Sequence, residues 1–284
     1  MTQLSPAEPP LLEVLSASKR YGSRSHPVRA LSEVSLQLWR GERLGVVGES
    51  GSGKSTLARL LVALEMPEEG DIRFKGKSIV GRSRRELEEL HRSVQMVFQD
   101  PFGTLDPRLR VAESVAEPLR ALKIGGDLGR RVEELLEAVG MPAGSGRRYP
   151  HQLSGGQRQR VAIARALAPS PEVLIADEAV SALDVAVRAQ VLNLIASLVE
   201  RFGLSMLFIS HDMAVIRHVC TRVLVLFRGQ VVEEGPTEQL FRQPSHPYTA
   251  ALISSVPTLG GRIQEPRAPD WEGGPTSTGA EPVP

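Results

Sequence analysis

The sequence predicts an α/β fold whose core is a mainly parallel sheet. Three short apolar runs, residues 44–47, 173–176 and 206–209, are typical of strands that are buried on both faces of such a sheet. Each run is followed at once by polar residues, and ligands of α/β proteins gather at these carboxyl ends of the strands. Helix and strand patterns alternate along the chain between the runs, as this fold class requires.

Shorter patterns predict an additional β layer and two of the helices. Val34, Leu36 and Leu38 alternate with polar residues, which predicts a half-buried strand in an N-terminal antiparallel β layer. Apolar residues at helical spacing predict helices over residues 132–139 and 187–198. We therefore expect a parallel core sheet, an antiparallel layer and amphipathic helices in one chain.

Three further regions complete the predicted organisation. Residues 83–140 read as a mostly helical arm that is inserted between the first and second core strands. Residues 223–227 and 230–233, joined by a two-residue turn, predict a hairpin. Prolines within residues 1–10 and a Pro/Gly-rich run at 259–284 predict a disordered lead-in and a disordered tail.

Composition excludes several classes of protein. The chain has 284 residues, 41% of them hydrophobic, which is enough for a substantial core. Its 34 Lys+Arg against 33 Asp+Glu argue against a nucleic-acid binder that works through bulk charge. The single cysteine, Cys220, excludes an intrachain disulfide and reads as a small buried apolar residue. Without a secretory signal or a long apolar run, we expect a cytoplasmic protein.

A phosphate-binding loop is predicted at residues 48–55, which read GESGSGKS after a strand and before a helix. Glycines let such a loop wrap a triphosphate with its backbone N–H groups, and the helix N-terminus adds a positive dipole end. Lys54 supplies a cation for the β- and γ-phosphates, and the Ser55 hydroxyl is a ligand for Mg²⁺. The candidate ATP-binding residues are Gly48, Glu49, Ser50, Gly51, Ser52, Gly53, Lys54, Ser55 and Thr56.

A second helix start, LSGGQ at residues 153–157, also suits phosphate. Ser154 and Gln157 form an ordinary capping box, which is the structural alternative. Each glycine costs about 1 kcal/mol relative to alanine inside a helix, so two glycines favour a close approach of another phosphate. Two such helix starts cannot both bind one γ-phosphate in a compact monomer unless the fold brings them together.

Together these motifs resemble the ABC ATPase family over residues 11–258. The family's fold is a P-loop NTPase core with an N-terminal antiparallel β layer and an inserted helical subdomain, here at about residues 83–165. In this family the signature completes the ATP site of the opposite subunit in a head-to-tail dimer. The resemblance therefore implies that four residues bind ATP in trans, namely Ser154, Gly155, Gly156 and Gln157.

Three more polar residues match the family's catalytic motifs. Gln99 resembles the Q-loop glutamine, which senses Mg²⁺ and the attacking water and touches the transporter. Asp177 and Glu178 resemble the Walker B pair, so Asp177 would hold Mg²⁺ and Glu178 would polarise the attacking water. The alternative is that the two acids cap the next helix.

The remaining family positions lie on loops after strands. Ser181 and Asp184 resemble the D-loop, which links the two sites across the dimer, and His211 resembles the switch histidine that contacts the γ-phosphate. Tyr21 occupies the place of an aromatic that stacks on adenine, although packing is its alternative role. Residues 179–180 are Ala-Val where the family commonly has Pro-Thr, and we expect no loss of activity from this departure.

Residues 97–108, 148–152 and 246–252 resemble the peptide, nickel and opine importer branch. The C-terminal segment, at about residues 236–258, suits a dipeptide or oligopeptide ATPase subunit. That branch often continues into a cysteine-bearing element, which this sequence lacks. A nickel-type importer subunit therefore stays open as the alternative.

The resemblance implies an ATPase that uses ATP and Mg²⁺ to energise uptake of di- or oligopeptides. Its expected partners are two transmembrane permease subunits, a second ABC ATPase subunit and, indirectly, an extracytoplasmic substrate-binding protein. Its expected location is the cytoplasmic face of the membrane. Two other hypotheses are a soluble, non-transport ABC ATPase acting in DNA repair or translation and an ABC subunit that binds ATP without turnover.

Overall fold

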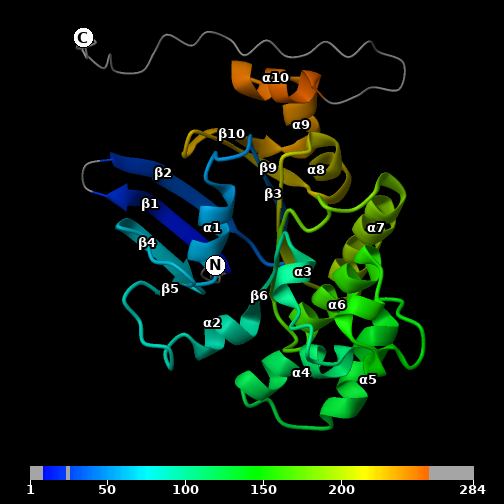
Figure 1. Ribbon diagram of the computed structural model, residues 1–284. Coiled ribbons are helices and arrows are strands. Elements are labelled where there is room, and N and C mark those ends of the chain that lie inside the picture. The colour runs from blue at the N-terminus through cyan, green and yellow to red at the C-terminus, as the bar shows by residue number, and fades with distance from the viewer. Residues whose placement is uncertain (1–8, 24–25, 256–284) are drawn as a thin grey trace, which may run out of the picture.

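Two sheets of different kinds form the framework of a computed structural model, which describes residues 9–23 and 26–255 (Figure 1). The larger sheet has six strands among these residues, in the order β10 (Gln230–Pro236), β9 (Arg222–Phe227), β3 (Arg43–Val47), β8 (Ser205–Ser210), β7 (Val173–Asp177) and β6 (Val94–Val97). Adjacent strands of this sheet are parallel, except that β10 is antiparallel to β9. The mainly parallel core predicted from the apolar runs is confirmed.

An antiparallel layer covers one face of this sheet. In the described residues it has four strands, in the order β2 (His26–Leu38), β1 (Leu12–Ser23), β4 (Glu69–Phe74) and β5 (Lys77–Ser78). Its buried side chains form one hydrophobic core with α1 (Lys54–Leu61) and with alternate residues of the parallel strands, such as Ile175 and Leu207. Val34, Leu36 and Leu38 are buried in this core, as their alternation predicts.

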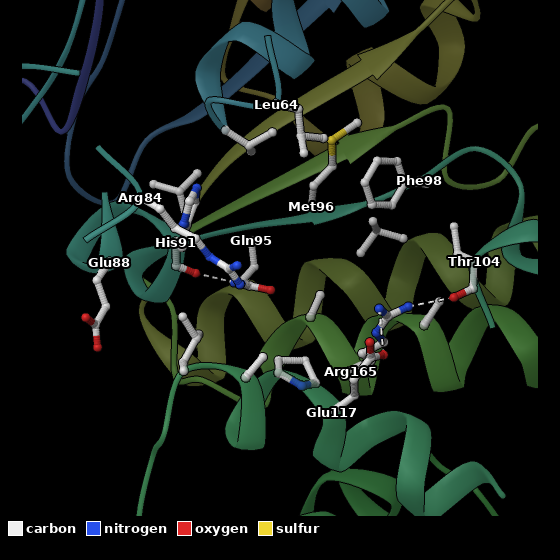
Figure 2. Close-up of a pocket in the computed structure, with 18 of the residues that line it drawn as sticks. Leu64, Arg84, Glu88, His91, Gln95, Met96, Phe98, Thr104, Glu117 and Arg165 are labelled. Atoms are coloured by element: carbon white, nitrogen blue, oxygen red, sulfur yellow. Dashed lines mark hydrogen bonds and ion pairs between the residues drawn. The ribbon is translucent and has the colours of Figure 1, made fainter. Parts of the chain in front are cut away.

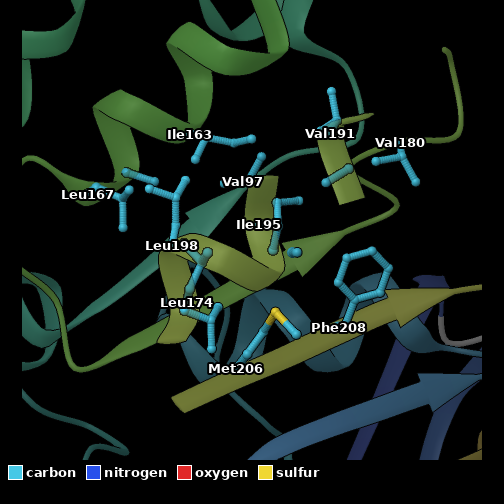
Figure 3. Packing of buried hydrophobic residues seen from close by; sticks show 14 of the residues in the cluster. Val97, Ile163, Leu167, Leu174, Val180, Val191, Ile195, Leu198, Met206 and Phe208 are labelled. Atoms are coloured by element: carbon cyan, nitrogen blue, oxygen red, sulfur yellow. The ribbon is translucent and has the colours of Figure 1, made fainter. Parts of the chain in front are cut away.

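Helices cover the opposite face of the parallel sheet. Leu174, Met206 and Phe208 of the sheet belong to a second core with residues of α6 (Gly155–Leu167) and α7 (Val185–Phe202), such as Ile163 and Ile195 (Figure 3). Side chains of one strand alternate between the two cores, because successive residues point to opposite faces. The strands are therefore apolar throughout, which is why they stand out in the sequence as unbroken runs.

The inserted region contains a strand that was not expected. Residues 83–140 form α2 (Glu88–Ser93), β6, α3 (Pro101–Thr104), α4 (Val111–Ala121) and α5 (Leu128–Ala138). The region is mostly helical, as expected, but the prediction did not include β6, where Val94 pairs with Val173 at the edge of the parallel sheet. A run of four residues is too short for its periodicity to distinguish strand from helix.

The rest of the chain agrees with the sequence predictions where it is described. β9 and β10 form the expected hairpin, with Phe227 opposite Gln230, and Cys220 is free and buried. The last elements are α8 (Met213–Val219), α9 (Thr237–Arg242) and α10 (Pro247–Ser254). Residues 1–8 of the predicted lead-in and the whole of the predicted tail lie outside the described residues. None of the helices that the structure describes has the length and apolar character needed to cross a membrane.

Candidate nucleotide-binding site

The phosphate loop (residues 48–55) connects β3 to α1 and needs glycine for steric reasons. Gly48 and Gly53 have φ values of 155° and 107°, in the region that side chains rarely adopt. A Cβ atom at Gly48 would lie 2.1 Å from the Leu226 carbonyl oxygen, and one at Gly53 would lie 2.3 Å from that of Ala30. The loop is therefore packed against the backbones of β9 and β2, and only glycine fits there.

Lys54 lies inside the phosphate loop. Its Nζ atom donates hydrogen bonds of 2.7 Å to the carbonyl oxygens of both Gly48 and Glu49, and the residue is only 4% exposed. Burial lowers the pKa of Lys54, while the charges of Glu178 and Asp177 oppose that shift. The loop therefore encloses a cation at the start of α1, a combination that suits the phosphates of a nucleotide.

Asp177, the last residue of β7, faces the start of α1. The Ser55 hydroxyl donates to Asp177 Oδ1 at 3.3 Å, and Asp177 is 5% exposed. Burial raises the pKa of the Asp177 carboxyl, and the hydrogen bond from Ser55 partly offsets this. A hydroxyl and a carboxylate oxygen side by side are ligands of the kind that Mg²⁺ takes beside a phosphate-binding loop. The residues at this position therefore fit a magnesium ion.

Glu178 is held between two other polar residues at the carboxyl edge of the sheet. Gln99 Nε2 donates to Glu178 Oε2 at 2.9 Å, and His211 Nδ1 lies 3.2 Å from Glu178 Oε1. Glu178 has a φ of 46°, unusual for a residue with a side chain, and its N–H donates to the Ile209 carbonyl at 3.0 Å. Residues that follow β6, β7 and β8 thus meet around one carboxylate, as adjacent carboxyl ends of parallel strands allow.

The segment after Glu178 joins this cluster to the next helix. Ser181 Oγ donates to the Glu178 carbonyl at 3.0 Å. Asp184 caps α7, because its Oδ1 accepts a 3.0 Å hydrogen bond from the Val187 N–H. The cap of this helix is therefore Asp184, and the alternative interpretation of Asp177 and Glu178 as capping residues is wrong.

Tyr21, at the end of β1, lies beside the first turn of α1. Its hydroxyl donates to Thr56 Oγ1 at 3.5 Å and also hydrogen-bonds with Glu65. The residue is 37% exposed and does not belong to either hydrophobic core. An exposed aromatic next to the phosphate loop is suitably placed to contact a base.

The signature segment (residues 153–157) opens α6 and lies apart from α1 (Figure 1). Ser154 Oγ accepts from the Gln157 N–H at 3.3 Å, and Gln157 Oε1 accepts from the Ser154 N–H at 3.1 Å, which confirms the capping box. A Cβ atom at Gly155 would meet nothing closer than 3.7 Å, whereas one at Gly156 would lie 2.5 Å from the side chain of Val187. Packing within the chain therefore accounts for Gly156 but leaves Gly155 without a structural reason.

A cavity of about 1000 Å³ opens between the parallel sheet and the helical layer (Figure 2). Phe98, which precedes Gln99, lines one side of it and is 38% exposed. Arg165 of α6 lines the opposite side, where it donates to the Thr104 carbonyl at 2.6 Å and pairs with Glu117 of α4. The cavity is therefore lined by Phe98, the neighbour in sequence of Gln99, which hydrogen-bonds with Glu178.

Sequence reasoning missed one residue that contacts the phosphate loop. The Tyr248 hydroxyl, on α10, accepts a 2.8 Å hydrogen bond from the Glu49 N–H. The only signal was the family-like run at residues 246–252, to which no role at the site was given. Periodicity cannot reveal a contact between residues 199 positions apart.

The fold and the phosphate loop define a P-loop nucleotide-binding protein. Residues 31–181 match a family model described as ABC transporter, so the chain belongs to the ABC transporter family. Residues 232–278 match a second model, described as Oligopeptide/dipeptide transporter, C-terminal region. The two models together span most of the region in which the sequence resembles ABC ATPases, and the recognition of the family is confirmed.

Curated relatives carry related names. The chain is 52% identical over 236 residues to a putative peptide import ATP-binding protein of Brucella abortus (strain 2308), covering 81% of this chain and 70% of that protein. It is 48% identical over 267 residues to a glutathione import ATP-binding protein of Escherichia coli (strain K12), covering 91% of this chain. The match covers 43% of the latter, so the chain spans less than half the length of that relative.

Solved structures agree on the fold. One is a dimeric post-hydrolysis state of an ATP-binding cassette bound to ADP and Pi, with a TM-score of 0.73 and 32% identity over 80% of this chain and 98% of that one. Another is the cbiO1 protein of Clostridium perfringens, part of an ABC transporter complex, with a TM-score of 0.72 and 29% identity over 83% of this chain and 92% of that one. The predicted ABC ATPase fold is therefore confirmed.

Proposed function

We propose that the chain is the ATP-hydrolysing subunit of an ABC importer and that it drives separate permease subunits. The observation that carries this proposal is the carboxylate of Glu178, held by Gln99 and His211 beside the Ser55–Asp177 pair. A carboxylate fixed next to a phosphate site is the arrangement that activates water for hydrolysis. Gln99, Glu178 and His211 follow strands at one edge of the sheet, Asp177 ends β7, and Ser55 lies in the first turn of α1.

Each residue has a role that its geometry supports. The backbone N–H groups of the phosphate loop and Lys54 bind the phosphates, and Thr56 lies next to the α- and β-phosphates. Ser55, Asp177 and Gln99 would supply oxygen ligands for Mg²⁺, and the ion would neutralise phosphate charge. Tyr21 contributes a face for adenine, beside the first turn of α1.

Hydrolysis is the attack of water on the γ-phosphorus, with ADP as the leaving group. Glu178 accepts a proton from the attacking water, and the bond between the γ-phosphorus and the bridging oxygen breaks to give ADP and inorganic phosphate. Gln99 and His211 hold the Glu178 carboxylate before the reaction, and His211 then contacts the γ-phosphate. The contacts of Gln99 and His211 with Glu178 keep the three side chains at one place in the site before ATP binds.

The signature segment serves a second ATPase subunit in our proposal. Gly155 has no packing reason to be glycine, and the N-terminus of a helix suits a phosphate brought by another subunit. The dimeric cassette similar to this chain supports such an assembly. Ser154, Gly155, Gly156 and Gln157 then complete the partner's site, while Ser181 and Asp184 link the two sites.

The cavity beside Phe98 is the proposed docking site for a permease helix. It lies between the sheet and the helical layer, and Phe98 is adjacent to Gln99 in the chain. A permease helix that moves Phe98 would also move the side-chain amide of Gln99, which hydrogen-bonds with Glu178. A subunit docked in this way would lie on the cytoplasmic face of the membrane, and an extracytoplasmic binding protein would deliver cargo to the permeases.

Di- or oligopeptides are the proposed cargo. The match of residues 232–278 to the oligopeptide/dipeptide transporter model supports this class over the nickel-type alternative. Relatives named for import of peptides and of glutathione, itself a tripeptide, support it as well. The cargo is bound by the permeases and the binding protein, so its identity rests on these likenesses.

The substitution Glu178→Gln tests the proposed chemistry. We expect hydrolysis to fall by about 10³-fold, because the amide cannot accept the proton from water. ATP binding should persist, and size-exclusion chromatography with ATP and Mg²⁺ should show a stable dimer. Phosphate release measures the rate.

Glu172→Gln is a matched control, because Glu172 precedes β7 and pairs with Lys75 and Arg40 away from the loop. We expect it to hydrolyse ATP at the wild-type rate. A Glu178→Gln protein that hydrolyses ATP as fast as the wild type would show that Glu178 is not the catalytic base.

A further inference from the structure

The C-terminal helix α10 reaches the phosphate loop through one side chain. The Tyr248 hydroxyl accepts a hydrogen bond of 2.8 Å from the Glu49 N–H, and the tyrosine is only 7% exposed. Glu49 is the second residue of the loop, directly after Gly48, so the contact lies where the chain leaves β3. The N–H of Glu49 is thereby committed to α10 and not to a phosphate.

Two sets of contacts fix the position of Tyr248. Its ring packs on Phe227, at the end of β9, with the ring centroids 4.2 Å apart. The Glu233 carboxylate of β10 accepts hydrogen bonds from the N–H groups of Ser245 and His246, at 2.8 and 3.0 Å. These contacts anchor the chain just before α10, so the hydroxyl is aimed at the loop by both the hairpin and the helix start.

The same hairpin also holds the far side of the loop. The N–H of Gly229, in the turn between β9 and β10, donates to the Ser52 carbonyl at 2.9 Å. The loop is therefore bound at Glu49 by α10 and at Ser52 by the hairpin turn. Between these two points lie Ser50 and Gly51, both exposed, and Gly51 has a φ of 80°. The anchors flank the most pliable part of the loop.

We propose that Tyr248 is a positioning residue for the phosphate loop, whose hydroxyl holds the Glu49 peptide so that the loop is preformed for ATP. This inference rests on the proposed function, and it gives the C-terminal segment a part in nucleotide affinity. A loop fixed before binding loses less conformational freedom when the nucleotide arrives. Burial raises the pKa of Tyr248, so the hydroxyl remains neutral at physiological pH.

The substitution Tyr248→Phe removes the hydroxyl and keeps the ring against Phe227. We expect the KM for ATP and the dissociation constant of a fluorescent ATP analogue to rise about fivefold, the effect of losing one hydrogen bond. The value of kcat should stay unchanged, since the loss affects binding of the ground state and the transition state equally. Amide exchange of the peptide that contains Glu49 should become faster.

Tyr149→Phe is the matched control, because Tyr149 lies in the helical layer with its ring stacked on His151. It loses the same atom at a distance from the loop, so its KM should equal that of the wild type. Melting temperatures of both variants, taken without nucleotide, report whether either one is unfolded. A purely structural role for Tyr248 would lower the melting temperature and the active fraction while KM stayed constant.

The outcomes separate this inference from the proposed function. If the wild type binds ATP and Tyr248→Phe binds it equally well, the positioning role is wrong and the proposed function stands. A fall in kcat at constant KM would overturn the positioning role as well. Failure of the wild type itself to bind ATP would overturn both. A KM raised in Tyr248→Phe alone, together with faster exchange at Glu49, supports the proposal.

Discussion

The phosphate loop and the signature segment are both glycine-rich helix starts, yet the chain treats them differently. The loop is packed at both ends, with Gly48 and Gly53 against neighbouring backbones and Lys54 buried within it. At the signature segment, Gly155 has space around it, and Ser154 and Gln157 form a capping box with each other. Packing within the chain therefore requires glycine in the loop but not at residue 155.

This difference shows that two glycine-rich helix starts in one chain can be under different packing constraints. In the loop, glycine is required by the fold of the same chain, so its replacement should damage stability. At Gly155, the protomer alone has no need of glycine, so any requirement must come from a ligand or a second subunit. The comparison can be tested by substitutions that affect one region and leave the other intact.

The largest effect is expected from Gly155→Asp. A carboxylate in the first turn of α6 is favourable for the helix itself, so the protomer should fold normally. Facing a phosphate, the same charge should reduce hydrolysis by at least about 100-fold, the scale of losing one phosphate-stabilising group. ATP binding to the isolated chain should persist, as measured by fluorescence titration. If ATP hydrolysis and ATP binding were both lost, the signature segment would belong to the chain's own ATP site. The proposed difference between the two segments would then be wrong.

The next prediction compares how alanine at Gly53 and at Gly155 changes the free energy of unfolding. Gly53→Ala places a Cβ atom 2.3 Å from the Ala30 carbonyl at a φ of 107°, and should lower the free energy of unfolding by at least about 2 kcal/mol. Gly155→Ala should be neutral or slightly stabilising, because its Cβ atom meets nothing closer than 3.7 Å. Denaturant unfolding of both variants measures this. Equal destabilisation would show that the protomer needs both glycines.

The smallest effect concerns the free energy of unfolding, which the buried Asp177 carboxylate lowers. Burial raises the pKa of Asp177, so the folded chain binds this proton more tightly than the unfolded chain does. Stability therefore falls as pH rises from the ordinary Asp value through the raised pKa, and the full cost is present at neutral pH. Asp177→Asn removes that cost and should raise the melting temperature of the nucleotide-free protein by about 2–4 °C. The gain should shrink as the pH is lowered towards the ordinary Asp value.

Ser154→Ala is the counterpart at the signature segment. It removes a helix cap that contributes to stability, so it should lower the free energy of unfolding by about 1 kcal/mol. Thermal melts at neutral pH should thus move in opposite directions for the two variants. An Asp177→Asn protein less stable than the wild type would mean that the hydrogen bond from Ser55 outweighs burial at this carboxylate.

Much of the fold and the site could be predicted because the determining patterns are local. The three apolar runs became β3, β7 and β8, and the hairpin formed at its predicted turn. β6 was missed because a four-residue strand owes its conformation to pairing with β7, which lies far along the chain. The assigned roles of the motif residues remain predictions, although Gln99, Glu178 and His211 do lie together.

The sequence by itself determined the glycines, the lysine and the order of the motifs, because spacing within a loop or a helix turn is a local property. Only the tertiary structure decided which of these motifs meet within one chain. It joined Gln99 and His211 to Glu178 across three strands and left the signature segment apart. It also placed Tyr248 on the phosphate loop, since a contact between residues 199 positions apart depends on how the sheet and its hairpin bring the chain back.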